Sequence, residues 1–130
     1  MPATYLDSSA IVKLAVAEPE SEALRRHLRR RRPLVSSALA RTEVLRALLP
    51  AGSDAVAAGR AVLASLELLR VNDKVLDAAG ALQPADLRSL DAIHLATGQQ
   101  LGAELAQLVA YDERLLAAAA THGINTAAPR

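Results

Sequence analysis

The chain has 130 residues, of which 52% are hydrophobic and 22% are charged, and its formal net charge is +1. These values indicate a folded protein of one domain, residues 1–130, and exclude a disordered chain. The lack of cysteine excludes disulfides and thiolate metal sites, and the lack of a signal-peptide pattern or a membrane-length apolar run favours a cytoplasmic protein with no membrane partner.

Short apolar runs alternate with longer helical patterns along the chain. Strands separated by helices imply an α/β fold in which a mostly parallel central sheet of four to five strands is covered on both faces, as a three-layer α/β/α arrangement. In the first part of the chain, the pattern predicts a strand at 3–6, a helix at 8–17 opened by serine caps, a helix at 19–31 and a strand at 33–36. A helix capped by Ser36 or Ser37 then reaches Leu49, and a helix at 53–66, a strand within 66–71 and a helix at 74–82 capped by Asp73 follow. The last part is predicted to form a helix at 90–101 capped by Ser89, a strand at 107–111, a helix at 113–122 and an edge strand at 124–127.

Four acidic residues fall near the ends of these elements. Asp7 ends the first strand and Asp112 follows the fourth, so both are expected at the rim where the carboxyl ends of parallel strands meet. Asp91 lies in the first turn of its helix. Glu43 lies about two turns beyond the serine caps of its own helix, among small and apolar residues. Together the four acids indicate one shared pocket.

Each acid alone has a plainer explanation. Asp7 fits a turn residue at a strand end, Asp91 complements a helix dipole, and Asp112 fits a helix N-cap. Glu43 fits a solvated position less well, because its neighbours on the helix are apolar or small.

A bound cation would reconcile four acids in one pocket. Two carboxylates about 5 Å apart repel by roughly 3 kcal/mol at an effective dielectric constant of about 20, so such a group either protonates or binds a cation. Carboxylate oxygens suit Mg²⁺ or Mn²⁺, whereas zinc is a poor candidate because the 3 histidines are scattered. Sites of this kind cut phosphodiesters, and the helix start at Ser8 and Ser9 adds donors for an anion.

Four segments resemble the PIN-domain ribonucleases, specifically the VapC toxins of bacterial type II toxin–antitoxin pairs. They are "YLDSSAIVKL" at 5–14, "ARTEVLRAL" at 40–48, "LRSLDAIHLA" at 87–96 and "VAYDERL" at 109–115, and they span nearly the whole chain. The third is the most specific, because an acid followed by "AIHLA" after "LRSL" is typical of the family. The resemblance implies a PIN-like α/β/α fold, an Mg²⁺- or Mn²⁺-dependent endoribonuclease, a homodimer, and inhibition by a VapB-like antitoxin whose basic segment occupies the groove.

The resemblance also implies roles for the acids. It makes Asp7, Glu43, Asp91 and Asp112 catalytic, with Asp7 and Asp91 as direct Mg²⁺ ligands. Glu43 and Asp112 would act through water or a second ion, and Glu43 would orient or deprotonate the nucleophile. The family usually has Thr or Ser two residues before the last acid, but Ala110 stands there. Asp112 therefore lacks the hydroxyl that usually supports it.

Several basic residues add weaker predictions. The segment "LRRHLRRRR" at 24–32 places Arg25, Arg29 and Arg32 on one helical face, which fits either a solvated surface or phosphate contacts with RNA. His94 follows Asp91 by three residues, and we expect it to pack or form hydrogen bonds more than to act as a base.

Two further side chains have open roles. Ser9 either caps its helix, bonds to Asp7 or donates to a phosphate. Arg88 pairs either with an acid or with RNA.

Two other functions fit the sequence less well. A phosphotransfer domain with Asp7 as nucleophile lacks a second acid at Ser9 and any lysine after Asp112. A non-catalytic PIN-like module, whose acidic groove only captures a basic partner segment, would not need all four acids. With 2 tyrosines and no Phe or Trp, the chain also lacks a platform for stacking bases.

Overall fold

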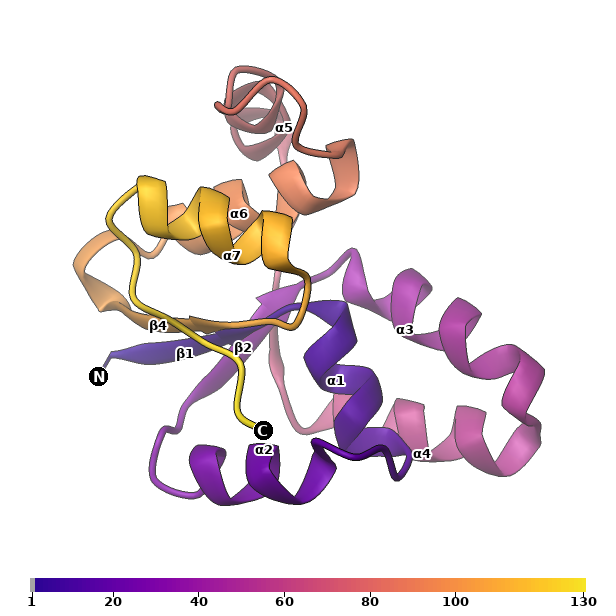
Figure 1. Cartoon of the computed structure of the whole chain (residues 1–130). Helices are drawn as coiled ribbons and strands as arrows, with labels where there is room; N and C mark the ends of the chain where they lie inside the picture. Colours follow the sequence, from indigo (N-terminus) through magenta and orange to yellow (C-terminus); the bar gives the residue numbers. More distant parts are fainter. Residues whose placement is uncertain (1) are drawn as a thin grey trace.

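The computed structural model describes residues 2–130. Its strands are β1 Ala3–Leu6, β2 Leu34–Ser37, β3 Glu67–Leu69, β4 Leu105–Val109 and β5 Thr126–Ala127. Its helices are α1 Ser8–Ala15, α2 Ser21–Leu28, α3 Ala40–Leu48, α4 Ser53–Ala64, α5 Asp73–Gly80, α6 Ser89–Gln99 and α7 Glu113–Thr121, with short 3₁₀ turns at Leu49–Ala51 and Gly102–Glu104. The predicted order of strands and helices is confirmed (Figure 1).

The five strands form one sheet in the order β3-β2-β1-β4-β5, and every pairing is parallel. The prediction of a mostly parallel sheet of four to five strands is thus confirmed. The chain builds outward from β1 through β2 to β3, then returns to the other side of β1. At this reversal point the Asp7 backbone N–H donates to the Val109 carbonyl oxygen at 3.1 Å. Ligands of such sheets bind outside the carboxyl ends of the strands at this point.

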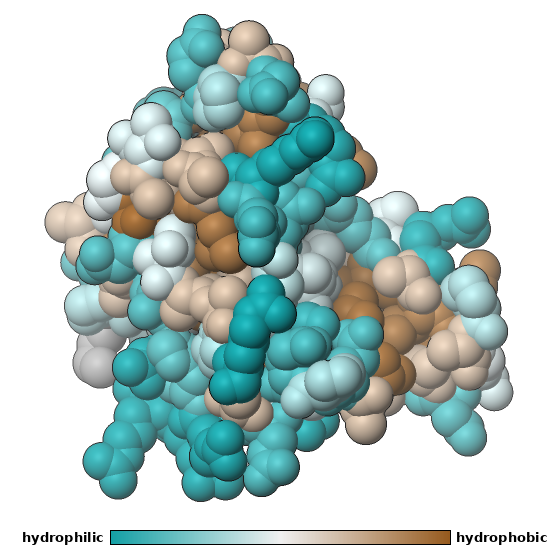
Figure 2. Space-filling model, in the orientation of Figure 1, coloured by the Kyte–Doolittle hydropathy of each residue, from teal (hydrophilic) through white to brown (hydrophobic). Residues whose placement is uncertain are grey.

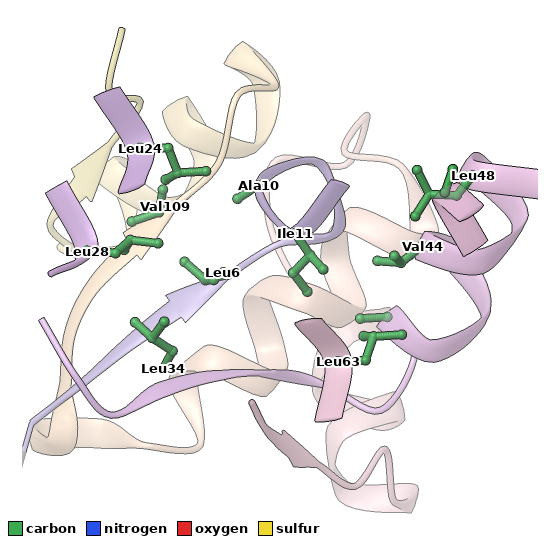
Figure 3. Close-up of a cluster of buried hydrophobic side chains, with 12 residues drawn as sticks. Leu6, Ala10, Ile11, Leu24, Leu28, Leu34, Val44, Leu48, Leu63 and Val109 are labelled. Atoms are coloured by element: carbon green, nitrogen blue, oxygen red, sulfur yellow. The ribbon is translucent and has the colours of Figure 1, made fainter. Parts of the chain in front are cut away.

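Helices cover both faces of the sheet, which gives the three predicted layers (Figure 1). On one face, α1 to α4 pack around a cluster that includes Leu6 and Val44 (Figure 3). On the other face, α6 and α7 pack around Tyr5, Leu95 and Leu115, and α5 packs against α6. Tyr5 and Leu6 are neighbours on β1 and point to opposite faces. The strand is buried throughout for that reason, and its sequence is apolar at every position but Thr4.

The caps of α1 and α5 differ from the prediction. Asp7 caps α1, not Ser8 or Ser9, which lie inside the helix. Asn72 caps α5, not Asp73. In both cases the residue before the helix has an extended backbone, and its side chain accepts a hydrogen bond from the backbone N–H three residues on.

The predicted serine caps of α3 and α6 are also wrong. Ser36 and Ser37 belong to β2, and α3 begins at Ala40 without a side-chain cap. Ser89 is the first residue of α6, after Arg88, whose side chain makes no capping bond. A serine near a helix start is therefore a weak guide to the helix boundary in this chain.

Apolar side chains reach the surface in several places. Figure 2 shows one group between α1 and the pair α3 and α4, and others over α7 and α5, within a mostly hydrophilic face. Val12, Leu45 and Val56 are only partly buried where they pack against the core of that layer. Across residues 2–130, every helix is too short or too polar to cross a bilayer.

Candidate active site

Asp7 follows β1 directly and is largely buried, with 5% of its surface exposed. Its Oδ1 accepts hydrogen bonds from the Ala10 backbone N–H at 3.0 Å and from the Ser9 hydroxyl at 2.7 Å. Within residues 2–130, the other carboxylate oxygen of Asp7, Oδ2, has no hydrogen-bond partner. Every fully buried side-chain oxygen in this part of the chain does have a partner. Oδ2 therefore reaches solvent at the rim of the sheet.

The surroundings of Asp7 disfavour its charge. Burial raises the pKa of Asp7 above its usual range, and the hydrogen bonds from Ser9 and Ala10 offset this only in part. The nearby Asp91 carboxylate raises the pKa further. A helix cap needs no such burial, since a solvated aspartate caps equally well. A cation at the free oxygen would favour the charged form.

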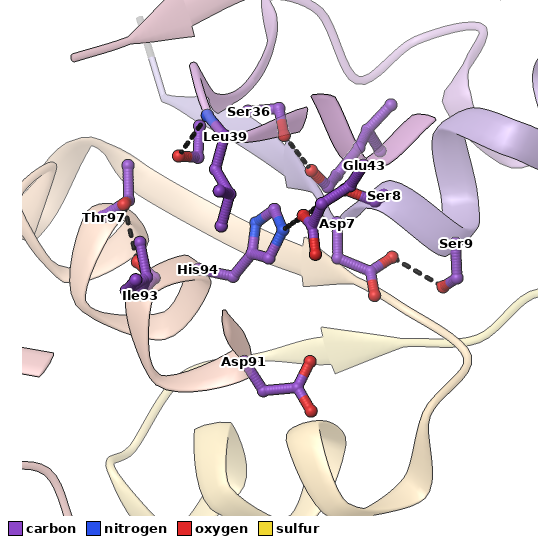
Figure 4. A network of polar contacts seen from close by, with 12 residues as sticks. Asp7, Ser8, Ser9, Ser36, Leu39, Glu43, Asp91, Ile93, His94 and Thr97 are labelled. Carbon is purple, nitrogen blue, oxygen red and sulfur yellow. Dashed lines mark hydrogen bonds and ion pairs between the residues drawn. The ribbon is translucent and has the colours of Figure 1, made fainter. Parts of the chain in front are cut away.

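Glu43 lies in the first turn of α3, not two turns into it, because the helix begins only at Ala40. Its Oε1 accepts hydrogen bonds from the Ser8 hydroxyl at 2.6 Å and from His94 Nε2 at 2.5 Å (Figure 4). Burial alone would raise the pKa of Glu43, but the hydrogen bonds from His94 and Ser8 lower it. Glu43 is thus held as a carboxylate, and among the described residues its Oε2 has no hydrogen-bond partner.

Ser8 and Ser9 tie two acids to the start of α1 (Figure 4). Consecutive residues of a helix point about 100° apart, so Ser9 reaches Asp7 while Ser8 reaches Glu43. The bond from Ser9 to Asp7 is one of the alternatives that the sequence leaves open. The bond from Ser8 to Glu43 is not predicted, because the two residues are 35 positions apart in the chain.

Arg88 joins the other two acids. Its Nη2 lies 3.0 Å from Asp91 Oδ2 and 3.0 Å from Asp112 Oδ2, and its Nε donates to Asp91 Oδ2 at 3.1 Å. Asp112 also caps α7, because its Oδ1 accepts from the Leu115 backbone N–H at 3.0 Å. The sequence predicts either an acid or RNA as the partner of Arg88, and in the structure Arg88 pairs with the acids Asp91 and Asp112. Both oxygens of Asp112 are engaged, whereas all contacts of Asp91 end on Oδ2.

His94 is buried on α6 and forms hydrogen bonds with Glu43 and Tyr5, not with Asp91. Nε2 contacts Glu43 Oε1, and Nδ1 lies 2.7 Å from the Tyr5 hydroxyl. The Tyr5 contact joins residues 89 positions apart, so no local pattern identifies His94 as the partner. The one signal in the sequence is Tyr5 itself, because a tyrosine in a buried strand usually needs a polar partner for its hydroxyl.

The arginine-rich segment does not form the predicted helical face. Because α2 ends at Leu28, Arg29 and Arg32 lie beyond it and share no face with Arg25. Like charges four positions apart repel on a helix, as Arg25 and Arg29 would, and the residue before Pro33 is driven away from helical backbone angles. Both effects oppose a helix that continues to the predicted Arg31.

The arginine-rich segment also lies at the opposite edge of the sheet from the acids. Residues 30–32 line a surface pocket with Thr4 and Gln107, near the amino ends of β1 and β4. With a rise of about 3.3 Å per residue, the 4 residues of β1 separate this edge from Asp7 by on the order of 13 Å. The arginines are therefore not part of the acidic pocket.

The acids are not arranged as a closed metal cage. Within residues 2–130, no three Asp, Glu or His side chains are grouped as ready metal ligands. Mg²⁺ does not need such a cage, because it keeps several waters and binds proteins through one or two carboxylates. Asp7, Glu43 and Asp91 each have an oxygen free of protein contacts, and Figure 4 shows them gathered from three elements. This donor set fits a hard divalent cation.

Comparison with known sequences gives one family and several close relatives. The model of the PIN domain family matches residues 4–121. The chain is 64% identical over 129 residues to ribonuclease VapC46 of Mycobacterium tuberculosis (strain ATCC 25618 / H37Rv), covering 99% of both chains. It is 38% identical over 130 residues to ribonuclease VapC47 of Mycobacterium tuberculosis (strain CDC 1551 / Oshkosh), covering 96% of both.

Two solved structures are similar in fold. One is Mycobacterium tuberculosis VapC20, described as a sarcin-ricin loop cleaving toxin, with a TM-score of 0.75 and 18% identity over 89% of this chain and 95% of that one. The other is a toxin–antitoxin complex from Klebsiella pneumoniae, with a TM-score of 0.72 and 20% identity over 88% and 91% of the two chains. At these identities the likeness shows a shared fold.

Proposed function

Because this chain belongs to the PIN-domain family and is a ribonuclease of the VapC type, we propose that it hydrolyses RNA phosphodiester bonds with Mg²⁺ or Mn²⁺. It acts as the endoribonuclease toxin of a type II toxin–antitoxin pair, with residues 1–130 as one PIN domain in the cytoplasm. The observation that carries the proposal is the set of carboxylate oxygens presented at the reversal point of the sheet.

The contacts of each acid indicate a different role in the proposed reaction. Asp7 and Asp91 would hold the cation, because each presents a free oxygen. Such a cation, when bound, neutralises charge on the phosphate and makes water a stronger nucleophile. Glu43, kept ionised by His94 and Ser8, would orient a water molecule and accept its proton.

The start of α1 is proposed as a lesser contact with the phosphate. Asp7 already takes the Ala10 backbone N–H, so only the earlier backbone N–H groups of the first turn are left for an anion. Most of the negative charge of the scissile phosphate would therefore be balanced by the cation.

Removal of divalent cations is expected to abolish RNA cleavage, because the acids repel the RNA phosphate until a cation neutralises them. EDTA should stop the release of RNA fragments, and excess Mg²⁺ or Mn²⁺ should restore it. Calorimetry should show Mg²⁺ binding to the wild-type protein and none to the Asp7→Asn/Asp91→Asn variant. Continued cleavage in EDTA, by protein freed of contaminating nucleases, would rule out metal dependence. A non-catalytic binding module would release no fragments under any of these conditions.

The arginine-rich segment is proposed as a second contact with RNA, away from the cleaved bond. Arg29, Arg30 and Arg32 are exposed, and in the described part of the chain no acid forms an ion pair with them. Arg25 is a weaker candidate, since its guanidinium already approaches the Leu14 carbonyl oxygen at 3.5 Å. Unpaired guanidinium groups suit phosphate oxygens.

The Arg29→Ala/Arg32→Ala variant is expected to bind RNA more weakly without a change in kcat, because these residues lie far from the acids. The slope of log affinity against log salt should fall by about 0.7 for each phosphate of single-stranded RNA that the variant no longer binds. Arg60→Ala, an exposed arginine on α4, is the matched control. An unchanged slope in the double variant would assign both arginines to a solvated surface.

The acidic rim is also proposed as the binding site of a VapB-like antitoxin. The contacts of Arg88 with Asp91 and Asp112 support this, because they show that the rim accepts a guanidinium. A basic side chain of the antitoxin would compete with both the cation and the RNA for these carboxylates. A homodimer, which the family resemblance implies, completes the proposed assembly.

A further inference from the structure

A buried chain of hydrogen bonds runs from the middle of the sheet to Glu43. Tyr5 on β1 is 0% exposed and His94 on α6 is 2% exposed. The Tyr5 hydroxyl lies 2.7 Å from His94 Nδ1, and His94 Nε2 lies 2.5 Å from Glu43 Oε1. The two rings also meet edge to face, with centroids 5.9 Å apart and planes at 78°. Three elements distant in the sequence thus meet at one carboxylate, as Figure 4 shows for His94 and Glu43.

The chemistry of the three groups fixes the direction of each hydrogen bond. An ionised carboxylate only accepts, so His94 Nε2 carries the proton that faces Glu43. A neutral imidazole has one donor and one acceptor nitrogen, so with the proton on Nε2 the His94 Nδ1 is an acceptor. The Tyr5 hydroxyl, which burial keeps protonated by raising its pKa, then donates to Nδ1. This hydrogen bond supports the tautomer whose proton faces Glu43.

The contacts of Glu43 are one-sided. Ser8 and His94 both end on Oε1, which leaves Oε2 turned away from the protein contacts. A glutamate side chain without such anchors would sample several rotamers, and its ordering would cost free energy at the moment of reaction. A misplacement of about 1 Å at a reacting group can cost on the order of 100-fold in rate.

We propose that Tyr5 and His94 are positioning residues for RNA hydrolysis, which hold Glu43 Oε1 so that Oε2 is presented to water at the site. The inference rests on the proposed role of Glu43 in that reaction. Neither Tyr5 nor His94 touches the substrate, because both are buried. They act only through Glu43.

Tyr5→Phe tests the first link, because it removes one hydroxyl and keeps the buried ring. With a short random-sequence RNA and Mg²⁺, we expect kcat to fall about 10- to 100-fold while the apparent KM stays the same. Tyr111→Phe is the matched control: it removes the other tyrosine hydroxyl, which donates to the Pro129 carbonyl oxygen at 2.9 Å, and should leave kcat unchanged. Nitrogen-15 NMR of metal-free protein should show the His94 Nδ1 signal shifting in Tyr5→Phe only, because that nitrogen loses its hydrogen bond, while Nε2 keeps the proton that faces Glu43.

His94 provides the second link. His94→Leu should lower kcat at least as much as Tyr5→Phe, and His94→Gln, which keeps an N–H donor, should restore part of the loss. In a Glu43→Gln background, Tyr5→Phe should cause no further loss, because residues that act through one group are not additive. Melting temperatures show which variants remain folded.

Three results would decide against the proposal. Wild-type kcat in both Tyr5→Phe and His94→Leu, with Glu43→Gln inactive, would overturn the positioning role and leave the role of Glu43 standing. An equal loss from Tyr5→Phe with and without Glu43→Gln would show that the pair acts on the fold instead. Full activity of Glu43→Gln would remove the proposed role of Glu43 itself, and the positioning role with it.

Discussion

Asp7→Asn is expected to lower RNA cleavage by at least about 100-fold. Loss of residues that only support metal ligands costs about 10- to 100-fold, so loss of a proposed direct ligand should reach the top of that range or exceed it. Asparagine keeps the shape of the side chain and its oxygen still caps α1. The loss should therefore appear in kcat and in Mg²⁺ affinity measured by calorimetry, without a loss of folded protein.

The same substitution should raise the melting temperature of the metal-free protein near neutral pH. Burial raises the pKa of Asp7 in the folded state. The charged carboxylate therefore costs stability once the pH rises above its unfolded pKa of about 3.9, and the cost grows until the pH passes the folded pKa. Below the unfolded value both states are protonated, and the cost disappears. The difference in melting temperature between variant and wild type should thus be near zero in acid and positive at neutral pH.

Asp77→Asn supplies the control for Asp7→Asn, since Asp77 is exposed on α5. It should change neither cleavage nor the pH dependence of melting. If Asp7→Asn instead kept full activity in highly purified protein, Asp7 would be only the cap of α1. A lower melting temperature at neutral pH would mean that capping by a charged group outweighs the cost of its burial.

The layers and the order of strands and helices along the chain follow from patterns that lie within single segments of the chain. The run at Ala3–Leu6 is apolar at every position but Thr4, as expected for a strand covered on both faces. Asp7 directly after this strand and Asp112 shortly after β4 therefore reach the same rim by topology alone. Caps are harder to predict, because Asp7, Ser8 and Ser9 are all good capping residues. Backbone angles at one residue decide among them, and a composition pattern does not contain those angles.

Contacts between distant segments account for most of what the sequence does not predict. The bonds from Ser8 to Glu43 and from Tyr5 to His94 each depend on how two layers pack, and no local period encodes them. The predicted helix through the arginine-rich segment is too long for a different reason. The helical periodicity of the sequence continues past Leu28, but charge repulsion and Pro33 oppose a longer helix. The positions of the acids were thus predictable, and the distant contacts that orient Glu43 were not.

Asp91→Asn and Asp112→Asn are expected to differ in effect, although the resemblance treats both acids as catalytic. Asp91 presents a free oxygen beside Glu43, and the two residues line one pocket with Arg88. Asp91→Asn should therefore lower cleavage by at least about 100-fold, as expected for Asp7→Asn, and should also weaken Mg²⁺ binding.

Asp112 has both oxygens occupied, one by the Leu115 N–H and one by Arg88, and Ala110 supplies no hydroxyl to redirect it. Because asparagine caps a helix about as well as aspartate, Asp112→Asn should lower cleavage by less than about 10-fold, the lower end of the range for supporting residues. Asp112→Ala should in addition destabilise the protein by about 1 kcal/mol through loss of the cap, visible as a lower melting temperature. Equal losses of cleavage and of Mg²⁺ affinity in Asp91→Asn and Asp112→Asn would instead place Asp112 among the cation ligands, with Arg88 displaced from it when the cation binds.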